Sequence, residues 1–228
     1  MLRGGDHPVK RRGFVLLTGM TLTAPAHQWL IHEPGPLQSG LSGRQVSAKL
    51  VDRFTAMIPE LRAMDDIAGG GSVLSLAQHE FGWAAGLLDQ ASYDETTGRK
   101  LHIALAELGQ LAGWAAYDAD KQALAQRYYV AGLRAAHSAD DRPLGAHILG
   151  SMALQAADEG HPAEAVTLIE FAFAGARGRR RRACSQSCTF GTLTPWEPCT
   201  MYRPARRRSR KLALTSNRGT MIHPGCTG

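Results

Sequence analysis

Two stretches of this 228-residue chain share the same helical spacing of small and large apolar residues, and this repetition constrains the fold more than any other feature. One runs from Gly113 to Ala136 and the other from Met152 to Gly175. When Asp120 is set against Gly160, a period of 40 residues, small residues match small residues and large apolar residues match large ones. The matched pairs are Ala125 with Ala165, Tyr129 with Ile169, Gly132 with Ala172, Leu133 with Phe173, Gly113 with Ala153, and Ala116 with Ala156. Such a unit cannot bury its apolar face alone, which predicts that the copies stack.

The segments before the repeat also have the apolar spacing of helices. The spacing predicts one helix after residue 72, with Ser72 as its N-cap, and another that Thr96 or Thr97 caps. It predicts a shorter helix before them, which Pro59 bends or ends. The two apolar stripes are Leu74, Ala77, Phe81, Ala84 and Leu88, and then Leu101, Leu105, Leu108, Ala112 and Ala115. No segment alternates with period two for long enough to make a sheet, so the chain is predicted to be all-α.

Each copy of the repeat is expected to be a helix, an acidic or glycine turn, and a second helix, an order that resembles the tetratricopeptide repeat. The period of that repeat is about 34 residues, so residues 137–145 are expected to form a longer connection here. We therefore expect tetratricopeptide-like antiparallel helix pairs in a short α-solenoid over residues 45–177. An ordinary helical bundle is the alternative.

Charge divides the chain sharply. Residues 1–176 hold 14 Lys and Arg against 19 Asp and Glu, whereas residues 177–228 hold 12 against 1. All four cysteines lie in this second part. Residues 178–228 have no apolar stripe at helical spacing, which predicts a disordered basic tail. Its arginines would attract nucleic acid non-specifically, which makes sequence-independent binding through the tail an alternative function. The arginines concerned are Arg179, Arg180, Arg181, Arg182, Arg206, Arg207 and Arg208.

Residues 1–44 form a basic and apolar segment with two interpretations. Arg11-Arg12 before Phe14, an apolar run, and then Ala24-Pro25-Ala26 resemble a twin-arginine export signal. The preferred interpretation is a linker, which predicts a cytoplasmic protein, with export as the alternative. The apolar run is too short to span a bilayer, so no membrane span is expected.

Several quoted stretches resemble a known family. The C-terminal region of actinobacterial helix-turn-helix (Xre-type) transcriptional regulators is similar to four stretches of this chain. They are the turn from Met64 to Gly70 and, after it, ASYDETTGR, LAELGQLAGWAAYDA and RYYVAGLRAAH. The resemblance covers about His27 to Arg177 and implies a tetratricopeptide-like module that senses, oligomerises or binds a partner without catalysis. The sequence departs from the family in having no helix-turn-helix before His27 and no further helices after Arg177. We therefore expect a truncated or frame-shifted fragment that contacts DNA only indirectly or through its tail.

No catalytic, cofactor or metal motif is found, so an enzyme, a cofactor and a metal are not expected. Cys184, Cys188, Cys199 and Cys226 lack the paired spacing of zinc ligands. Gly69–Gly71 are expected to form a flexible turn, Asp65-Asp66 and Asp140-Asp141 to act in turns and caps, and His102 and His147 to pack in the core. The expected ligand is a protein, a peptide or a small effector, and the sequence leaves open whether the module is a homodimer. Aromatic residues of the predicted groove are Trp83, Tyr93, Trp114, Tyr117 and Tyr128.

Overall fold

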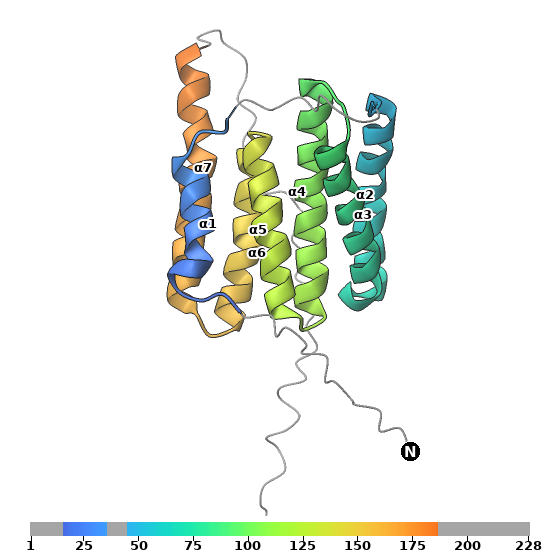
Figure 1. Ribbon diagram of the computed structural model, residues 1–228. Coiled ribbons are helices and arrows are strands. Elements are labelled where there is room, and N and C mark those ends of the chain that lie inside the picture. Colours follow the sequence, from blue (N-terminus) through green and yellow to red (C-terminus); the bar gives the residue numbers. More distant parts are fainter. Residues whose placement is uncertain (1–15, 36–44, 187–228) are drawn as a thin grey trace, which may run out of the picture. The chain divides into compact units, whose positions relative to one another are not determined.

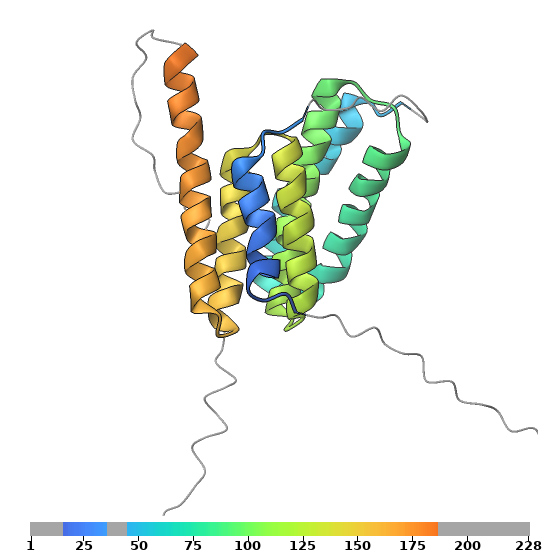
Figure 2. The ribbon, with the colours of Figure 1, turned by 60° about the vertical axis from the view of Figure 1, so that its left-hand side comes forward.

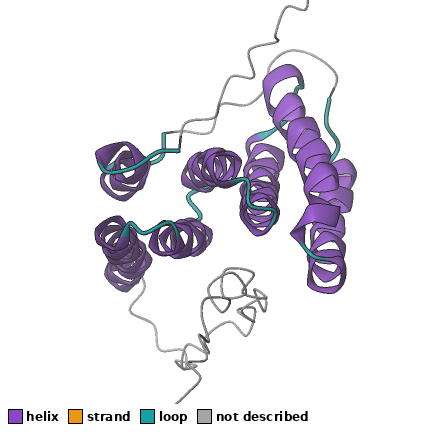
Figure 3. Ribbon diagram, turned by 90° about the horizontal axis from the view of Figure 1, so that it is seen from below, coloured by secondary structure: helices purple, strands orange, loops and turns teal. Residues whose placement is uncertain are grey.

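The computed structural model describes residues 16–35 and 45–186, with side chains as far as residue 177. The described residues form seven helices and no strand, which confirms the all-α class (Figure 1). The helices are α1 (Met20–Ile31), α2 (Ala48–Ala68), α3 (Gly70–Gln90), α4 (Glu95–Asp118), α5 (Gln122–Ser138), α6 (Arg142–Asp158) and α7 (Pro162–Gln186). Figure 3 shows several helices end on, with their axes roughly aligned. Because short turns join consecutive helices of this kind, the neighbours run antiparallel. No described helix is both long enough and apolar enough to cross a membrane.

Helix α4 lies at the centre, because it packs against α2, α3, α5 and α6. Its predicted stripe is buried or half-buried, as expected from the helical spacing. Leu108 and Ala112 pack with α2 and α3 in one apolar cluster. Ala115 and Ala116 pack with α5, α6 and α7 in a second cluster. The two clusters are therefore joined through the two faces of one helix.

Glycines let α4 and α5 approach closely. A Cβ at Gly109 would lie 2.8 Å from the Cα of Gly132, and a Cβ at Gly132 would lie 3.0 Å from the carbonyl oxygen of Ala106. Neither position has room for a side chain without movement of the backbone of the other helix. This confirms that small residues mark the helix contact, as the register of the repeat predicts.

Three turns of the same geometry separate α4, α5, α6 and α7. Asp120, Asp140 and Gly160 have positive φ angles of 61°, 53° and 85°. In each turn the next N–H bonds back five residues, at 2.8 Å, 2.9 Å and 2.8 Å, in the pattern of a Schellman cap. The predicted longer connection over residues 137–145 is wrong, because α5 runs to Ser138 and α6 starts at Arg142. The unit that repeats is one helix with its turn, every 20 residues.

The predicted ends of α2, α3 and α4 need correction. Helix α2 continues through Pro59 to Ala68, because Phe54, Ile58 and Leu61 bury the same face on both sides of the exposed proline. Helix α3 starts at Gly70 after Gly69, so Ser72 is not its N-cap. Gly69 alone forms the turn, with a φ angle of 78°, whereas Gly70 and Gly71 belong to α3. Gly70 is buried, and its Cβ would lie 2.8 Å from the carbonyl oxygen of Ala115.

The cap of α4 also differs from the prediction. Asp94, rather than Thr96 or Thr97, is the N-cap, and its Oδ1 accepts the N–H of Thr97 at 2.7 Å. These hydrogen bonds hold the pKa of Asp94 below its ordinary value. Just before α2, Val46 N–H donates to the carbonyl oxygen of Ser92 at 2.8 Å, beside an isolated bridge between Gln45 and Ser92. This contact ties the start of α2 to the end of α3.

The second copy of the repeat ends on an uncovered face. Tyr129 and Leu133 of α5 are buried, whereas their matches Ile169 and Phe173 of α7 are 37% and 59% exposed. Helix α5 has described helices on both sides, and α7 has only α6 and α1 among its main contacts. The repeat therefore predicts the backbone positions correctly, while burial depends on whether another helix follows.

Helix α1 lies within the segment that the sequence assigns to residues 1–44. It packs against α5 and α7, with Leu22, Ala26 and Trp29 buried (Figures 1 and 2). Pro25 lies inside this helix, and Ala26 of the candidate cleavage site is fully buried.

Candidate ligand groove between α2 and α3

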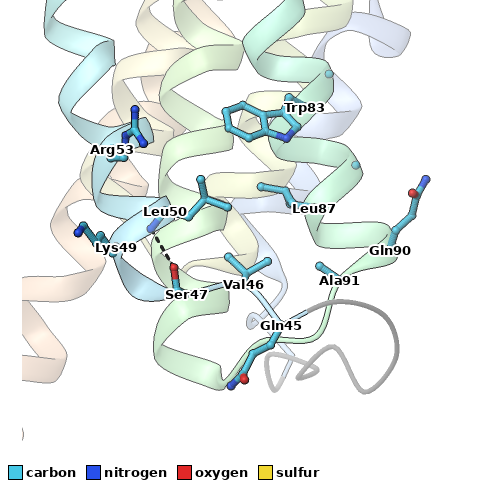
Figure 4. Close-up of a pocket in the computed structure, with 12 residues that line it drawn as sticks. Gln45, Val46, Ser47, Lys49, Leu50, Arg53, Trp83, Leu87, Gln90 and Ala91 are labelled. Carbon is cyan, nitrogen blue, oxygen red and sulfur yellow. Dashed lines mark hydrogen bonds between the residues drawn. The ribbon is translucent and has the colours of Figure 1, made fainter.

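An open groove of about 780 Å³ lies between the first half of α2 and the second half of α3 (Figure 4). The segment that leads into α2 closes one end. Its lining residues are Gln45, Val46, Ser47, Lys49, Leu50, Arg53, Gly82, Trp83, Gly86, Leu87, Gln90 and Ala91.

The floor of the groove is apolar and firmly held. Val46 and Ala91 are buried, and Leu50 and Leu87 pack against their cluster from α2 and α3. Ser47 caps α2, because its Oγ accepts the N–H of Leu50 at 3.3 Å (Figure 4). The floor therefore consists of apolar side chains that pack together from α2, from α3 and from the segments next to them.

Trp83 forms one wall. Its ring lies against that of the buried Phe54, with centroids 4.1 Å apart, and the residue remains 43% exposed. Beside it, a Cβ at Gly82 or at Gly86 would meet nothing within 4 Å. The wall thus combines an exposed aromatic ring with bare helix backbone, so a ligand can approach closely there.

The charged residues of the lining are both cations. Lys49 and Arg53 are exposed one turn apart on α2, and none of the described residues that line the groove is acidic. The nearby Asp52 is directed elsewhere, since its Oδ1 accepts a hydrogen bond from Lys100 Nζ at 3.0 Å. A local excess of positive charge favours anionic groups at this rim.

The predicted groove aromatics do not meet in one place. Trp83 lines the groove, and Tyr93 lies buried behind it, with its hydroxyl donating to the carbonyl oxygen of Leu88 at 3.0 Å. Burial raises the pKa of Tyr93. Trp114, Tyr117 and Tyr128 are not among the residues that line the groove.

Those three residues have packing partners. The rings of Trp114 and Tyr117 are 5.5 Å apart, and the buried Tyr117 donates a hydrogen bond to Asp158. Tyr128 meets Phe81 edge to face at 5.1 Å. The sequence did not indicate Lys49, Arg53, Leu50 and Leu87 as partners of Trp83. The spacing of Lys49 and Arg53 on one helix face was the available signal, but nothing local connects them to α3.

The remaining polar candidates are structural in the described part of the chain. His102 is half-buried, with Nδ1 2.9 Å from the carbonyl oxygen of Gly98, and burial lowers its pKa. His147 lies on α6 with an exposed side chain and is not a core residue, although desolvation by its neighbours and the charge of Arg62 lower its pKa. Asp140 and Asp141 form a turn and a cap as predicted, with Asp141 Oδ1 accepting the N–H of Leu144 at 3.0 Å.

Asp65 lies in the last turn of α2, near Asp118. Oδ2 of Asp118 accepts the N–H of Gly70 at 3.1 Å, which caps the start of α3. Burial raises the pKa of Asp65 to about 6, and the charges of Asp118 and Asp66 add to the shift. Asp65 is therefore a half-buried carboxyl group inside α2 whose ionisation is unfavourable. It is not the turn residue that the sequence predicts.

Two sets of predicted residues fall outside the described side chains. They are the arginines Arg179–Arg182 and Arg206–Arg208, and the cysteines Cys184, Cys188, Cys199 and Cys226. Over the residues that the structure describes, no group of three His, Cys, Asp or Glu side chains is placed to hold a metal ion.

The comparisons with known proteins add no family to this picture. No family model matches the chain, and neither a curated protein nor a solved structure matches it.

Proposed function

We propose that the protein is a non-catalytic interaction module, and that the groove between α2 and α3 binds its ligand. The observation that carries the proposal is the combination of Trp83, Lys49 and Arg53 around an apolar floor, with no acidic residue in the described part of the lining. A ligand with an apolar part against Trp83 and a carboxylate near Arg53 would match both features.

The volume of the groove is typical of sites for small ligands or a few residues of peptide. The bare backbone at Gly82 and Gly86 leaves room for an extended main chain. The exposed amides of Gln45 and Gln90 stand at the end of the groove and offer both donors and acceptors. These features favour a short acidic peptide segment over a compact effector.

The lining also supports binding rather than chemistry. Its described residues include no histidine, cysteine, aspartate or glutamate, which are among the usual acids, bases and nucleophiles of enzymes. The hydroxyl of Ser47, which is also in the lining, already caps α2.

We further propose that this module serves a transcriptional regulator in the cytoplasm. The support is the resemblance of residues 27–177 to the C-terminal region of Xre-type regulators. A second support is the burial of Ala26 in α1, which favours a linker over a cleaved export signal at that site.

A selection of displayed peptides tests the proposal. Phage-displayed random peptides are selected on the full chain and in parallel on its Lys49→Glu/Arg53→Glu variant, with Arg134→Glu as a control on the exposed surface of α5. We expect the wild-type chain and the Arg134→Glu variant to enrich the same acidic peptides with an aromatic or aliphatic anchor, and the double variant to lose them. Equal enrichment on all three proteins, or none on any, would contradict the proposal.

A further inference from the structure

Helix α1 is held by helices that are remote from it in sequence. Its main contacts are with α5 and α7, rather than with α2, which follows it in the chain. Residues 32–47 connect α1 to α2, whereas turns of one to four residues join all later neighbours. The position of α1 is therefore set by its docking contacts and not by a tight turn.

The two ends of the α1 segment are bound through their main chain. At the start, the amide of Gln126 pairs with the backbone of Leu17, accepting its N–H at 2.7 Å and donating to its carbonyl at 3.0 Å. Glu164 Oε1 accepts the N–H of Gly19 at 3.1 Å. Helix starts leave N–H groups without partners inside the helix, and Glu164 supplies an acceptor for one of them at the N-cap Gly19. Gln126 holds the segment just before the helix.

The end of α1 has a matching contact. The guanidinium of Arg142 donates to the carbonyl oxygen of Trp29 at 2.8 Å and to that of His32 at 3.3 Å. Arg142 also lies over the indole ring of Trp29, 5.2 Å from its centroid. One side chain thus caps the helix and covers its largest apolar residue.

Trp29 fits a socket that only glycine permits. A Cβ at Gly145 of α6 or at Gly175 of α7 would overlap the indole ring, and Trp29 is 2% exposed. The fit has one flaw, because the indole Nε1–H is buried without a hydrogen-bond partner among the described residues. A buried donor without an acceptor opposes docking, so the ring is held by the shape of the socket and by the Arg142 guanidinium over its face.

We propose that α5, α6 and α7 form a helix-binding groove, and that α1 of a second copy of this chain can fill it in place of the chain's own α1. Exchange of an element between copies needs no new interface, because every contact is kept. The connection of residues 32–47 could reach roughly 50 Å when extended, enough to place α1 on a neighbouring molecule. The observations that carry the proposal are the glycine socket and the side chains that bind both ends of α1.

Complementary variants test the exchange. Trp29→Ala removes the anchor of α1 and leaves the groove open, whereas Gly175→Leu blocks the groove and leaves α1 intact. We expect each full-length variant alone to be monomeric, and an equimolar mixture to form a 1:1 dimer in size-exclusion chromatography with light scattering. A mixture of Gly175→Leu with the double variant Trp29→Ala/Gly175→Leu should stay monomeric. Monomers alone in the first mixture would overturn the proposal.

A peptide measurement covers the case in which the blocked variant does not fold. A fluorescent peptide of residues 16–35 is titrated into the full-length Trp29→Ala chain, whose helix content is checked by circular dichroism. We expect saturable binding that weakens at least tenfold when the peptide itself carries Trp29→Ala. Loss of helix throughout the Trp29→Ala chain would mean that no groove exists without α1, and absence of peptide binding to a folded chain would equally overturn the proposal.

Discussion

The ring of Tyr129 in α5 lies directly against Gly113 in α4. A Cβ at position 113 would come within 2.5 Å of the Cδ1 and Cε1 atoms of the ring. Tyr129 is fully buried, so the ring has little freedom to move aside. Together with the Gly109–Gly132 contact, this contact therefore limits how closely α4 and α5 pack.

Gly113→Leu should destabilise the protein, because a side chain at this position must displace the Tyr129 ring. Overpacking of this kind costs about 1–3 kcal/mol and at times more. Lys121→Leu is the control, since Lys121 is exposed at the next turn. Urea unfolding followed by circular dichroism measures both. Equal midpoints for the two variants would show that the register of the α4–α5 contact is wrong.

Leu133→Ala and Phe173→Ala should differ, although the two residues occupy matching positions in the repeat. Leu133 is 1% exposed, so its truncation should cost about 2–5 kcal/mol, as in other cores. Phe173 is 59% exposed, so its loss should change stability by less than about 1 kcal/mol. Thermal melts of the full chain test this difference. A large loss from Phe173→Ala would mean that something covers the outer face of α7.

Asp65→Asn should stabilise the protein at neutral pH. The pKa of Asp65 is raised to about 6 in the folded protein from 3.8, so the folded state binds more protons between pH 4 and 6. Stability from this group is therefore present at low pH and is lost as the pH rises through about 6. Because Asp65 is only half-buried, we expect a gain of about 1 kcal/mol for the variant.

Urea unfolding of wild type and Asp65→Asn at pH 4 and pH 7.5 measures this effect. The advantage of the variant should be present at pH 7.5 and shrink toward pH 4, where wild-type Asp65 is protonated in the folded state. A difference that does not change with pH would show that ionisation of Asp65 is not the cause.

Arg142→Ala should loosen α1 without loosening the rest of the array. The guanidinium bonds to the main chain at the end of α1 and covers Trp29, whereas within its own helix Arg142 is only the first residue. Hydrogen exchange of the full chain should become at least tenfold faster in residues 20–31 and stay unchanged in α4. Arg134→Ala is the matched control on α5. Uniform acceleration through all helices would instead indicate general destabilisation.

The helices and their pairing could be predicted because local signals and burial agree. The matches Gly113 with Ala153 and Ala116 with Ala156 lie in buried contacts of α4 and α6, as the repeat indicates. The short length of the connection at Asp140 was not predicted, although a turn was expected there, because a positive φ at a residue other than glycine is uncommon. Pro59 does not end α2 as the sequence suggests, because burial of the neighbouring apolar residues outweighs the loss of one backbone hydrogen bond.

The groove and the docking of α1 could not be predicted, because both depend on residues far apart in the sequence. Arg53 and Trp83 belong to two helices that meet only after folding. Trp29 meets Gly145 and Gly175 more than a hundred residues later, and nothing near those glycines indicates an aromatic partner. Most of the aromatic residues chosen for the groove proved to be packing residues, since exposure cannot be read from residue type.

Binding at the α2–α3 groove is the central claim, and the affinity of one selected peptide tests it most directly. The peptide most enriched on the wild-type chain is titrated calorimetrically into wild type, Trp83→Ala, Arg53→Gln and the control Trp114→Phe, after circular dichroism confirms that each variant is folded. We predict at least tenfold weaker binding to Trp83→Ala and to Arg53→Gln, and unchanged binding to Trp114→Phe, which lies outside the groove. Equal affinity for all four proteins would contradict the account.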